Sequence, residues 1–141
     1  MNNKSKEKFI ILGEINIQPL INMEKALNGI LKDSKNKEGD AYQTYKMAAV
    51  QAFEVAYEIS WKTMKRVLKK YSIELHYSKD VFRESVKAGL INNPEKWFKF
   101  LEKRNETTHS YDSDILEDIF EILPEFNEEL NYLISKLKEK I

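Results

Sequence analysis

The stretch from Asp40 to Tyr71, DAYQTYKMAAVQAFEVAYEISWKTMKRVLKKY, decides the fold of this 141-residue chain. Its apolar, aromatic and small side chains recur at steps of three and four residues. The positions are Tyr42, Tyr45, Ala49, Ala52, Phe53, Ala56, Tyr57, Ser60, Met64, Val67, Leu68 and Tyr71. This spacing gathers them on one side of an α-helix. The stretch therefore predicts an amphipathic helix of roughly 30 residues.

The last turns of this helix carry five basic residues on the exposed side: Lys62, Lys65, Arg66, Lys69 and Lys70. Cations at this position interact favourably with the negative carboxyl-terminal end of the helix dipole. A solvated helix face explains most such runs, and it is the first interpretation. A patch that faces the phosphates of a nucleic acid is the alternative.

The sequence before the long helix predicts a second helix that starts near Pro19. Its apolar positions are Leu20, Met23, Leu27, Ile30 and Leu31. The polar run Asp33–Asp40 is then a connecting loop, and the two helices form an antiparallel hairpin. The earlier segment Phe9–Ile17 holds four contiguous apolar residues, which fit either a strand or an early helical turn. We assign this segment to a helix.

Helix boundaries after the long helix are marked by residues with special backbone preferences. Ser78 is predicted to cap a short helix, and Gly89 suits the left-handed conformation that ends one. Asn93 followed by Pro94 opens a further helix, because proline is pre-organised for the first helical position. This helix should run toward Arg104, with its inner side formed by Trp97, Phe98 and Leu101.

The last helix should begin after Ser110, where Asp112 or Ser113 can cap it. Its apolar stripe comprises Ile115, Ile119, Leu123, Phe126, Leu130, Leu133, Leu137 and Ile141. Pro124 should kink this helix. With only four glycines and three prolines in the chain, long helices are favoured over a many-turned sheet. We predict an all-α, antiparallel four- to five-helix up-down bundle that forms one domain over residues 1–141, with residues 1–17 fitting the pattern least.

Composition excludes several classes of protein. The chain has no cysteine, which rules out thiol catalysis, iron–sulfur clusters and disulfide scaffolds, and two histidines among scattered carboxylates argue against a metal site. We expect no metal and no cofactor. The 23 basic and 23 acidic residues balance, so any contact with RNA must be local. Without a signal peptide or an apolar run of ~20 residues, the expected location is the cytoplasm, without a membrane.

The segment Arg104–Tyr111, RNETTHSY, concentrates polar groups of catalytic type where one helix gives way to the next. A histidine can remove a proton from a ribose 2′-hydroxyl near neutral pH, and an arginine can hold the scissile phosphate. Residue types alone favour a simpler interpretation, in which these side chains cap a helix and bind water. In a regular helix Arg104 and His109 are not stacked neighbours, so they can converge only through an irregular turn or across a symmetric interface.

Arg104, Asn105, His109, Ser110 and Tyr111 fit the arginine, spacer, histidine, any residue, tyrosine signature of HEPN domains. The chain resembles the branch described as nucleotidyltransferase substrate-binding proteins. The resemblance extends over roughly Gln43 to Leu137 and includes Phe53-Glu54, Ser60-Trp61-Lys62-Thr63, Val81-Phe82-Arg83-Glu84-Ser85 and Lys87-Ala88-Gly89-Leu90-Ile91.

This resemblance implies a homodimer that pairs with a cognate minimal nucleotidyltransferase. In the first hypothesis the chain is the toxin of a toxin–antitoxin pair, a metal-independent endoribonuclease with RNA as its substrate. Arg104 and His109 would then be catalytic, Asn105 would support them, and Tyr111 would receive adenylate from the partner. The alternatives are a non-catalytic substrate-binding subunit of a two-component nucleotidyltransferase and a purely structural interaction protein. The chain lacks the glycine-serine and paired-aspartate signature of nucleotidyltransferases, so it should not transfer nucleotides itself.

Overall fold

The computed structural model describes residues 15–140, and all regular elements in this part of the chain are helical. The helices are α2 (Gln18–Ser34), α3 (Gly39–Lys70), α4 (Ser78–Lys87), α5 (Pro94–Glu106), α6 (Ser113–Glu121) and α7 (Leu123–Lys140), with a short 3₁₀ turn, η1 (Thr107–His109), after α5. The predicted all-α class is confirmed. Between residues 15 and 140, no helix is long and apolar enough to cross a membrane.

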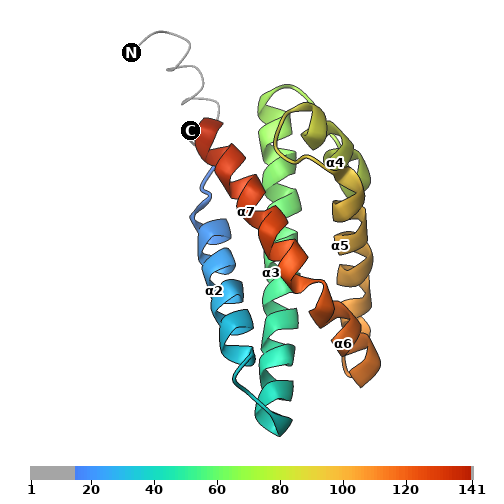
Figure 1. The fold of residues 1–141 in the computed structure, drawn as a ribbon. Coiled ribbons are helices and arrows are strands. Elements are labelled where there is room, and N and C mark those ends of the chain that lie inside the picture. Colours follow the sequence, from blue (N-terminus) through green and yellow to red (C-terminus); the bar gives the residue numbers. More distant parts are fainter. Residues whose placement is uncertain (1–14, 141) are drawn as a thin grey trace.

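The long helix α3 is the axis of the bundle (Figure 1). Helix α2 packs against α3 as the predicted antiparallel hairpin. Helix α5 runs antiparallel to α3 along another side, and α7 crosses α3 between α2 and α5. Of the segment Phe9–Ile17, residues 9–14 lie outside the described part. Residues 15–17 are not helical, which corrects the prediction there. The Asn16 side chain accepts a hydrogen bond from the Gln18 backbone N–H (2.9 Å) and so holds a turn just before α2.

Gly89 ends α4 as predicted. Its φ of +77° lies in the left-handed region, and two backbone hydrogen bonds close the turn, from Leu90 to Ser85 (2.9 Å) and from Gly89 to Val86 (3.1 Å). This pair of bonds satisfies carbonyl groups that the helix end would otherwise leave free. The same arrangement ends α3, but there a serine, Ser72, occupies the left-handed position with φ +66°.

The start of α5 also follows the prediction. The Asn93 side chain accepts from the Glu95 backbone N–H (3.0 Å), and Pro94 is the first helical residue. The predicted cap at Ser78 is wrong. Ser78 is already helical, and the extended backbone of a cap position belongs to Tyr77, whose side chain makes no capping bond.

Pro124 divides the predicted last helix into two. Helix α6 ends before Ile122, and α7 resumes with Pro124 in its first turn, where proline needs no backbone hydrogen bond. This division raises the number of helices in the described part to six. Asp112 caps α6 as predicted, and its carboxylate accepts from the N–H groups of Asp114 (2.9 Å) and Ile115 (3.3 Å).

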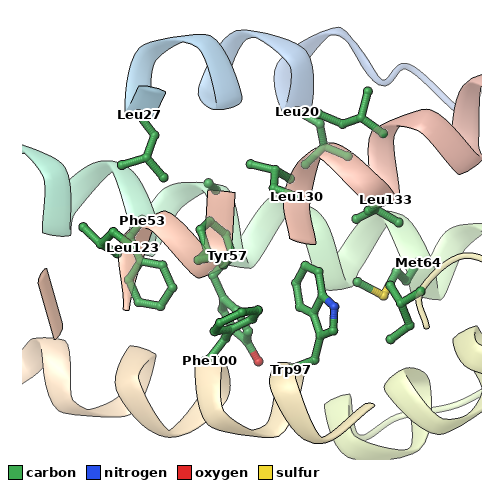
Figure 2. Packing of buried hydrophobic residues seen from close by; sticks show 14 of the residues in the cluster. Leu20, Leu27, Phe53, Tyr57, Met64, Trp97, Phe100, Leu123, Leu130 and Leu133 are labelled. Atoms are coloured by element: carbon green, nitrogen blue, oxygen red, sulfur yellow. The ribbon is translucent and has the colours of Figure 1, made fainter. Parts of the chain in front are cut away.

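An aromatic cluster fills the centre of the core, where α3, α5 and α7 meet (Figure 2). The Phe126 ring makes edge-to-face contacts with Phe53, Phe100 and Trp97 at centroid distances of 4.8, 5.1 and 5.9 Å. Such pairs add roughly 0.5–1.5 kcal/mol each beyond the burial of their surface. Trp97, which the sequence predicts as a core anchor, is only 1% exposed. The cluster fixes α5 against α3 and thereby positions the end of α5.

Candidate functional site

The RNETTHSY segment begins on the last turn of α5 and continues through η1. The Arg104 carbonyl accepts two hydrogen bonds from Thr107, one from its backbone N–H and one from its hydroxyl (2.7 Å). Ser110 N–H then bonds to the Thr107 carbonyl (3.1 Å). These bonds span three residues instead of four, so the helix tightens into a 3₁₀ turn. Thr107 is buried, and its hydroxyl is therefore part of the packing that holds this turn in place.

Arg104 lies across α3 and pairs with two glutamates one turn apart. Its Nε donates to Glu58 Oε1 at 3.1 Å, and its Nη2 is 3.8 Å from Glu54 Oε1. The Arg104 side chain is 25% exposed. The guanidinium is therefore held in one orientation, with part of its surface open to solvent. A fixed, accessible arginine is the group that chemistry on a phosphate requires.

Glu58 organises this part of the site. Its second carboxylate oxygen accepts from the indole N–H of Trp61 (3.1 Å) and lies 3.8 Å from the Lys62 ammonium. Trp61 is half-buried and so anchors the glutamate that holds Arg104. The Ser60-Trp61-Lys62-Thr63 stretch of the family resemblance thus lies directly beside the arginine of the RNETTHSY segment.

His109 and Tyr111 lie on the open side of the turn. His109 Nδ1 is 3.4 Å from the Tyr111 hydroxyl oxygen, and their rings meet edge-on at 6.0 Å between centroids. His109 is exposed, and Tyr111 is 84% exposed. A histidine in this position can exchange protons with a ligand, and the phenol can be reached by a macromolecule.

The structure of one chain does not bring the four predicted residues together. Ideal helix geometry across the 3₁₀ turn predicts that Arg104 and His109 point to roughly opposite sides of the helix axis. Between residues 15 and 140, no hydrogen bond or ion pair joins these two side chains. Asn105 lines a separate groove of about 570 Å³ along α5, together with Phe98 and Lys99. An irregular turn is therefore present, but in the described residues it makes no direct contact between Arg104 and His109.

A hollow of about 250 Å³ with a mixed polar and apolar lining adjoins the Arg104 pair along α3. It is lined by Met47, Val50, Gln51, Glu54, Val55, Ser110 and Leu116. Met47 and Val55 are 61% and 43% exposed, and both line this hollow. This surface lies between the glutamates of α3 and the turn that carries His109.

Sequence reasoning missed Glu54 and Glu58 as parts of the site. Both lie on the exposed side of a helix, where acidic residues are common, and only the packing of α5 on α3 makes them partners of Arg104. Lys103, next to Arg104, faces the other way and binds Asp118 of α6. This hydrogen bond raises the pKa of the Lys103 ammonium above its usual value. In the described residues, no group of three or more histidine, aspartate and glutamate side chains could hold a metal ion.

The amino-acid sequence matches one family model and is similar to a Haemophilus influenzae protein. A family model described as "nucleotidyltransferase substrate binding protein like" matches residues 18–139. A Haemophilus influenzae protein named "probable ribonuclease HepT" is 33% identical over 97 residues. The alignment covers 65% of this chain and 66% of that protein, slightly less than two thirds of its length.

Comparisons of structure find the same helical fold in solved proteins. A Haemophilus influenzae protein, described as having the fold of a substrate binding domain of a nucleotidyltransferase, superposes with a TM-score of 0.81 at 27% identity. The superposition covers 87% of this chain and 99% of that one. A Thermus thermophilus protein superposes with a TM-score of 0.68 at 24% identity, over 82% and 98% of the two chains, and shows the fold alone.

Proposed function

This chain belongs to the nucleotidyltransferase substrate binding protein like family, and on that premise we propose that it is a metal-independent endoribonuclease, the toxin of a toxin–antitoxin pair. Its cognate partner is a minimal nucleotidyltransferase. The observation that carries the proposal is the arrangement of the RNETTHSY segment: Arg104 is fixed by two glutamates, and His109 is exposed beyond a tight turn. The name of the Haemophilus influenzae relative, a probable ribonuclease, supports it.

In the proposed reaction His109 is the general base and Arg104 binds the scissile phosphate. The imidazole takes the proton of the ribose 2′-hydroxyl, and the 2′-oxygen attacks the neighbouring phosphorus. The bond from phosphorus to the 5′-oxygen breaks, and that oxygen takes a proton from solvent. Arg104 stabilises the extra negative charge on the phosphate oxygens during the attack. The products are a 2′,3′-cyclic phosphate and a 5′-hydroxyl, and Asn105 supports the two catalytic residues.

We place the reaction in a homodimer, because ideal helix geometry predicts that Arg104 and His109 of one chain point to roughly opposite sides of the helix. A two-fold axis beside the hollow next to Glu54 would bring Arg104 of one protomer toward His109 of the partner subunit. The exposed apolar residues Met47 and Val55 on the same surface support this location for the interface. Sedimentation should give about twice the 16.7 kDa chain mass, and a strict monomer at micromolar concentration would contradict the shared site.

Cleavage of single-stranded RNA in the presence of chelator tests the proposed activity. His109→Ala should abolish cleavage, because a general base contributes ~10²- to 10⁴-fold. Arg104→Lys should fail nearly as badly, since lysine keeps the charge but loses the planar two-pronged grip on phosphate. His76→Ala, which changes an exposed loop histidine, is the matched control and should cleave normally. Equal cleavage by all four proteins would indicate a contaminating nuclease.

Mixing the two inactive variants tests whether the site is shared between protomers. A heterodimer of the Arg104→Lys and His109→Ala chains has one complete pair, formed by the Arg104 of one chain and the His109 of the other. After exchange in equal amounts, half of the dimers are mixed, so about a quarter of wild-type activity should return. Continued inactivity in a mixture that has exchanged subunits would place both residues of each pair in one chain.

We further propose that Tyr111 is the residue that the partner modifies. The partner would transfer adenylate from ATP to the phenol oxygen, with pyrophosphate as the leaving group. The exposure of Tyr111 makes its hydroxyl accessible, and that oxygen lies only 3.4 Å from His109 Nδ1. A bulky, negatively charged adenylate at this point would crowd the general base and repel an RNA phosphate.

Intact-mass spectrometry with peptide mapping tests this modification in the presence of ATP, magnesium and the partner. Wild-type protein should gain one adenylate on Tyr111 and lose cleavage. Tyr111→Phe should remain folded and active, and should be insensitive to the partner's catalysis. Tyr77→Phe, which changes a second tyrosine that is 74% exposed, is the control and should still be modified. An unchanged mass on wild type, or the same gain on Tyr111→Phe, would exclude this residue.

The second candidate function is a non-catalytic subunit that holds substrate for the nucleotidyltransferase. It is favoured by the family description and by the nucleotidyltransferase substrate-binding fold of the Haemophilus influenzae structure. This function predicts no RNA cleavage by the purified chain. It also predicts that adding the chain lowers the KM of the partner for its own substrate, and that Tyr111→Phe does not alter this effect.

A further inference from the structure

The exposed side of α3 continues past the Arg104 pair as a row of four basic side chains, Lys62, Lys65, Arg66 and Lys69. We call these four residues the α3 basic row. They follow one another at steps of three or four residues or lie side by side, so they share one side of the helix. From Glu58 to Lys69 the helix rises by roughly 17 Å.

The row starts at the proposed catalytic arginine. Glu58 holds Arg104 with one carboxylate oxygen, and the ammonium of Lys62 lies 3.8 Å from the other. Lys65 follows, with its ammonium 5.8 Å from the centre of the Trp61 ring. A ligand that binds Arg104 can therefore meet Lys62 next, and then Lys65 beside the Trp61 ring, as it continues along α3.

The far end of the row has no acidic partner within the described part of the chain. Arg66 and Lys69 are exposed, and neither forms a hydrogen bond or an ion pair within residues 15–140. Elsewhere the basic residues commonly pair with a carboxylate. Examples are Lys46, Arg83, Lys87, Lys96, Lys99, Lys103 and Lys136.

A hollow of about 460 Å³ marks this end of the row. Its described lining consists of Ile15, Arg66, Lys69 and Lys70, with no carboxylate among them. In a chain whose charges balance overall, the two cations Arg66 and Lys69 create a local field at this hollow that attracts anions. Helix-dipole stabilisation explains cations in the last turn, but it does not explain Lys62 and Lys65, which lie well before it.

We propose that the α3 basic row binds the phosphate backbone of the RNA strand whose scissile phosphate lies at Arg104. The proposal rests on the ribonuclease function above and adds a binding surface outside the RNETTHSY segment. From Lys62 to Lys69 the row spans roughly 10 Å, which is long enough for about three nucleotides at ~3.4 Å of rise each. Exposed cations such as Arg66 and Lys69 suit a backbone that carries one charge per nucleotide, and they read charge rather than sequence.

Fluorescence anisotropy with a 12-nucleotide single-stranded RNA tests the row. His109→Ala is the parent chain, so that the probe is not cut. Arg66→Gln with Lys69→Gln should weaken binding by roughly tenfold at low salt. It should also reduce the slope of log K against log salt by about 1.4, because each phosphate contact on a single strand contributes ~0.7. Glutamine keeps the helix propensity of the replaced residues, and the helical spectrum should be unchanged.

The matched control removes two charges from the far end of α2. Lys32→Gln with Lys35→Gln changes two exposed lysines of the same chain, and it should leave the affinity and the salt slope unchanged. Equal losses of RNA affinity in both double variants would show a general charge effect and would contradict RNA binding by the α3 basic row. Unaltered RNA binding in the α3 variant, together with weaker binding of the nucleotidyltransferase, would assign the row to a protein partner instead.

These measurements distinguish RNA binding by the α3 basic row from the proposed ribonuclease activity. If wild-type protein cuts no RNA but binds it through Arg66 and Lys69, the row stands and the ribonuclease function is wrong. If wild-type protein cuts RNA and the α3 double variant binds and cuts as well as its parent, the ribonuclease function stands and the row is wrong.

Discussion

Replacing Glu58 by glutamine should release Arg104 without removing a side chain from the site. The Glu58 carboxylate accepts from Arg104 Nε at 3.1 Å and from Trp61 Nε1 at 3.1 Å, and Lys62 lies 3.8 Å away. Glutamine has nearly the same shape, but it is uncharged. It also presents one amide nitrogen to partners that are all donors. One of the two hydrogen bonds must therefore be lost, and the other loses its charge assistance.

The magnitude follows from the exposure of the pair. Hydrogen bonds to charged groups contribute about 1.5–3 kcal/mol when they are protected from water. The side chains of Glu58 and Arg104 are 33% and 25% exposed, so solvent screens the interaction toward the range of surface pairs. We expect Glu58→Gln to lower the free energy of unfolding by about 1 kcal/mol. For a chain of this size, that lowers Tm by roughly 3–5 °C.

A double-mutant cycle isolates the contact with Arg104. Urea unfolding, followed by helical circular dichroism at one fixed protein concentration, is measured for wild type, Glu58→Gln, Arg104→Gln and the double variant. The coupling energy should be about 0.5–1 kcal/mol and should shrink in high salt. Glu54→Gln is the matched control. Its carboxylate is 3.8 Å from Arg104 and 41% exposed, so its coupling should be smaller.

The same variants connect the contact to the proposed activity. If Glu58 positions Arg104, Glu58→Gln should lower kcat/KM for RNA by about tenfold, because a small misplacement of a catalytic group is costly. Glu54→Gln should have a smaller effect. A coupling energy below about 0.3 kcal/mol, or a larger coupling for Glu54 than for Glu58, would refute the assignment of Glu58 as the residue that holds Arg104.

Two further predictions concern stability. Burial raises the pKa of the Tyr57 phenol. The share of the free energy of unfolding that depends on keeping this phenol neutral is therefore fully present below pH ~10, and it is lost as the pH rises toward the folded-state pKa. The Tyr57 hydroxyl makes no hydrogen bond of normal geometry in the described residues, and the Ser78 side chain acts on it as a weak partner that lowers the pKa. In urea unfolding Tyr57→Phe should therefore lie within about 1 kcal/mol of wild type at pH 7 and be more stable above pH 10. The two left-handed helix ends should respond oppositely: Ser72→Gly should raise the free energy of unfolding by about 0.5–1 kcal/mol, and Gly89→Ala should lower it by a similar amount. Unfolding midpoints that move in the same direction would contradict this reasoning.

Local chemistry explains which boundaries the sequence predicted well. Gly89, Asn93, Pro94 and Asp112 each act on backbone groups within a few residues, so their effects can be read without the fold. The predicted cap at Ser78 was one residue too late, because α4 already begins at Ser78 and the cap position is Tyr77. Single-residue shifts of this kind are common at helix ends. The periodicity of the last helix was correct, but it did not show that the chain would break at Ile122.

The sequence by itself determined the helical class, the long central helix and the position of the RNETTHSY segment, because periodicity, capping and residue type are local properties. Only the tertiary structure decided what surrounds Arg104. Glu58 is 46 residues away in the chain, and no local pattern distinguishes it from other exposed glutamates. The aromatic core holds α5 against α3, which makes these two residues partners, while His109 contacts Tyr111 beyond the 3₁₀ turn. Contacts between distant segments depend on how helix surfaces fit together, so they appear only when the chain is folded.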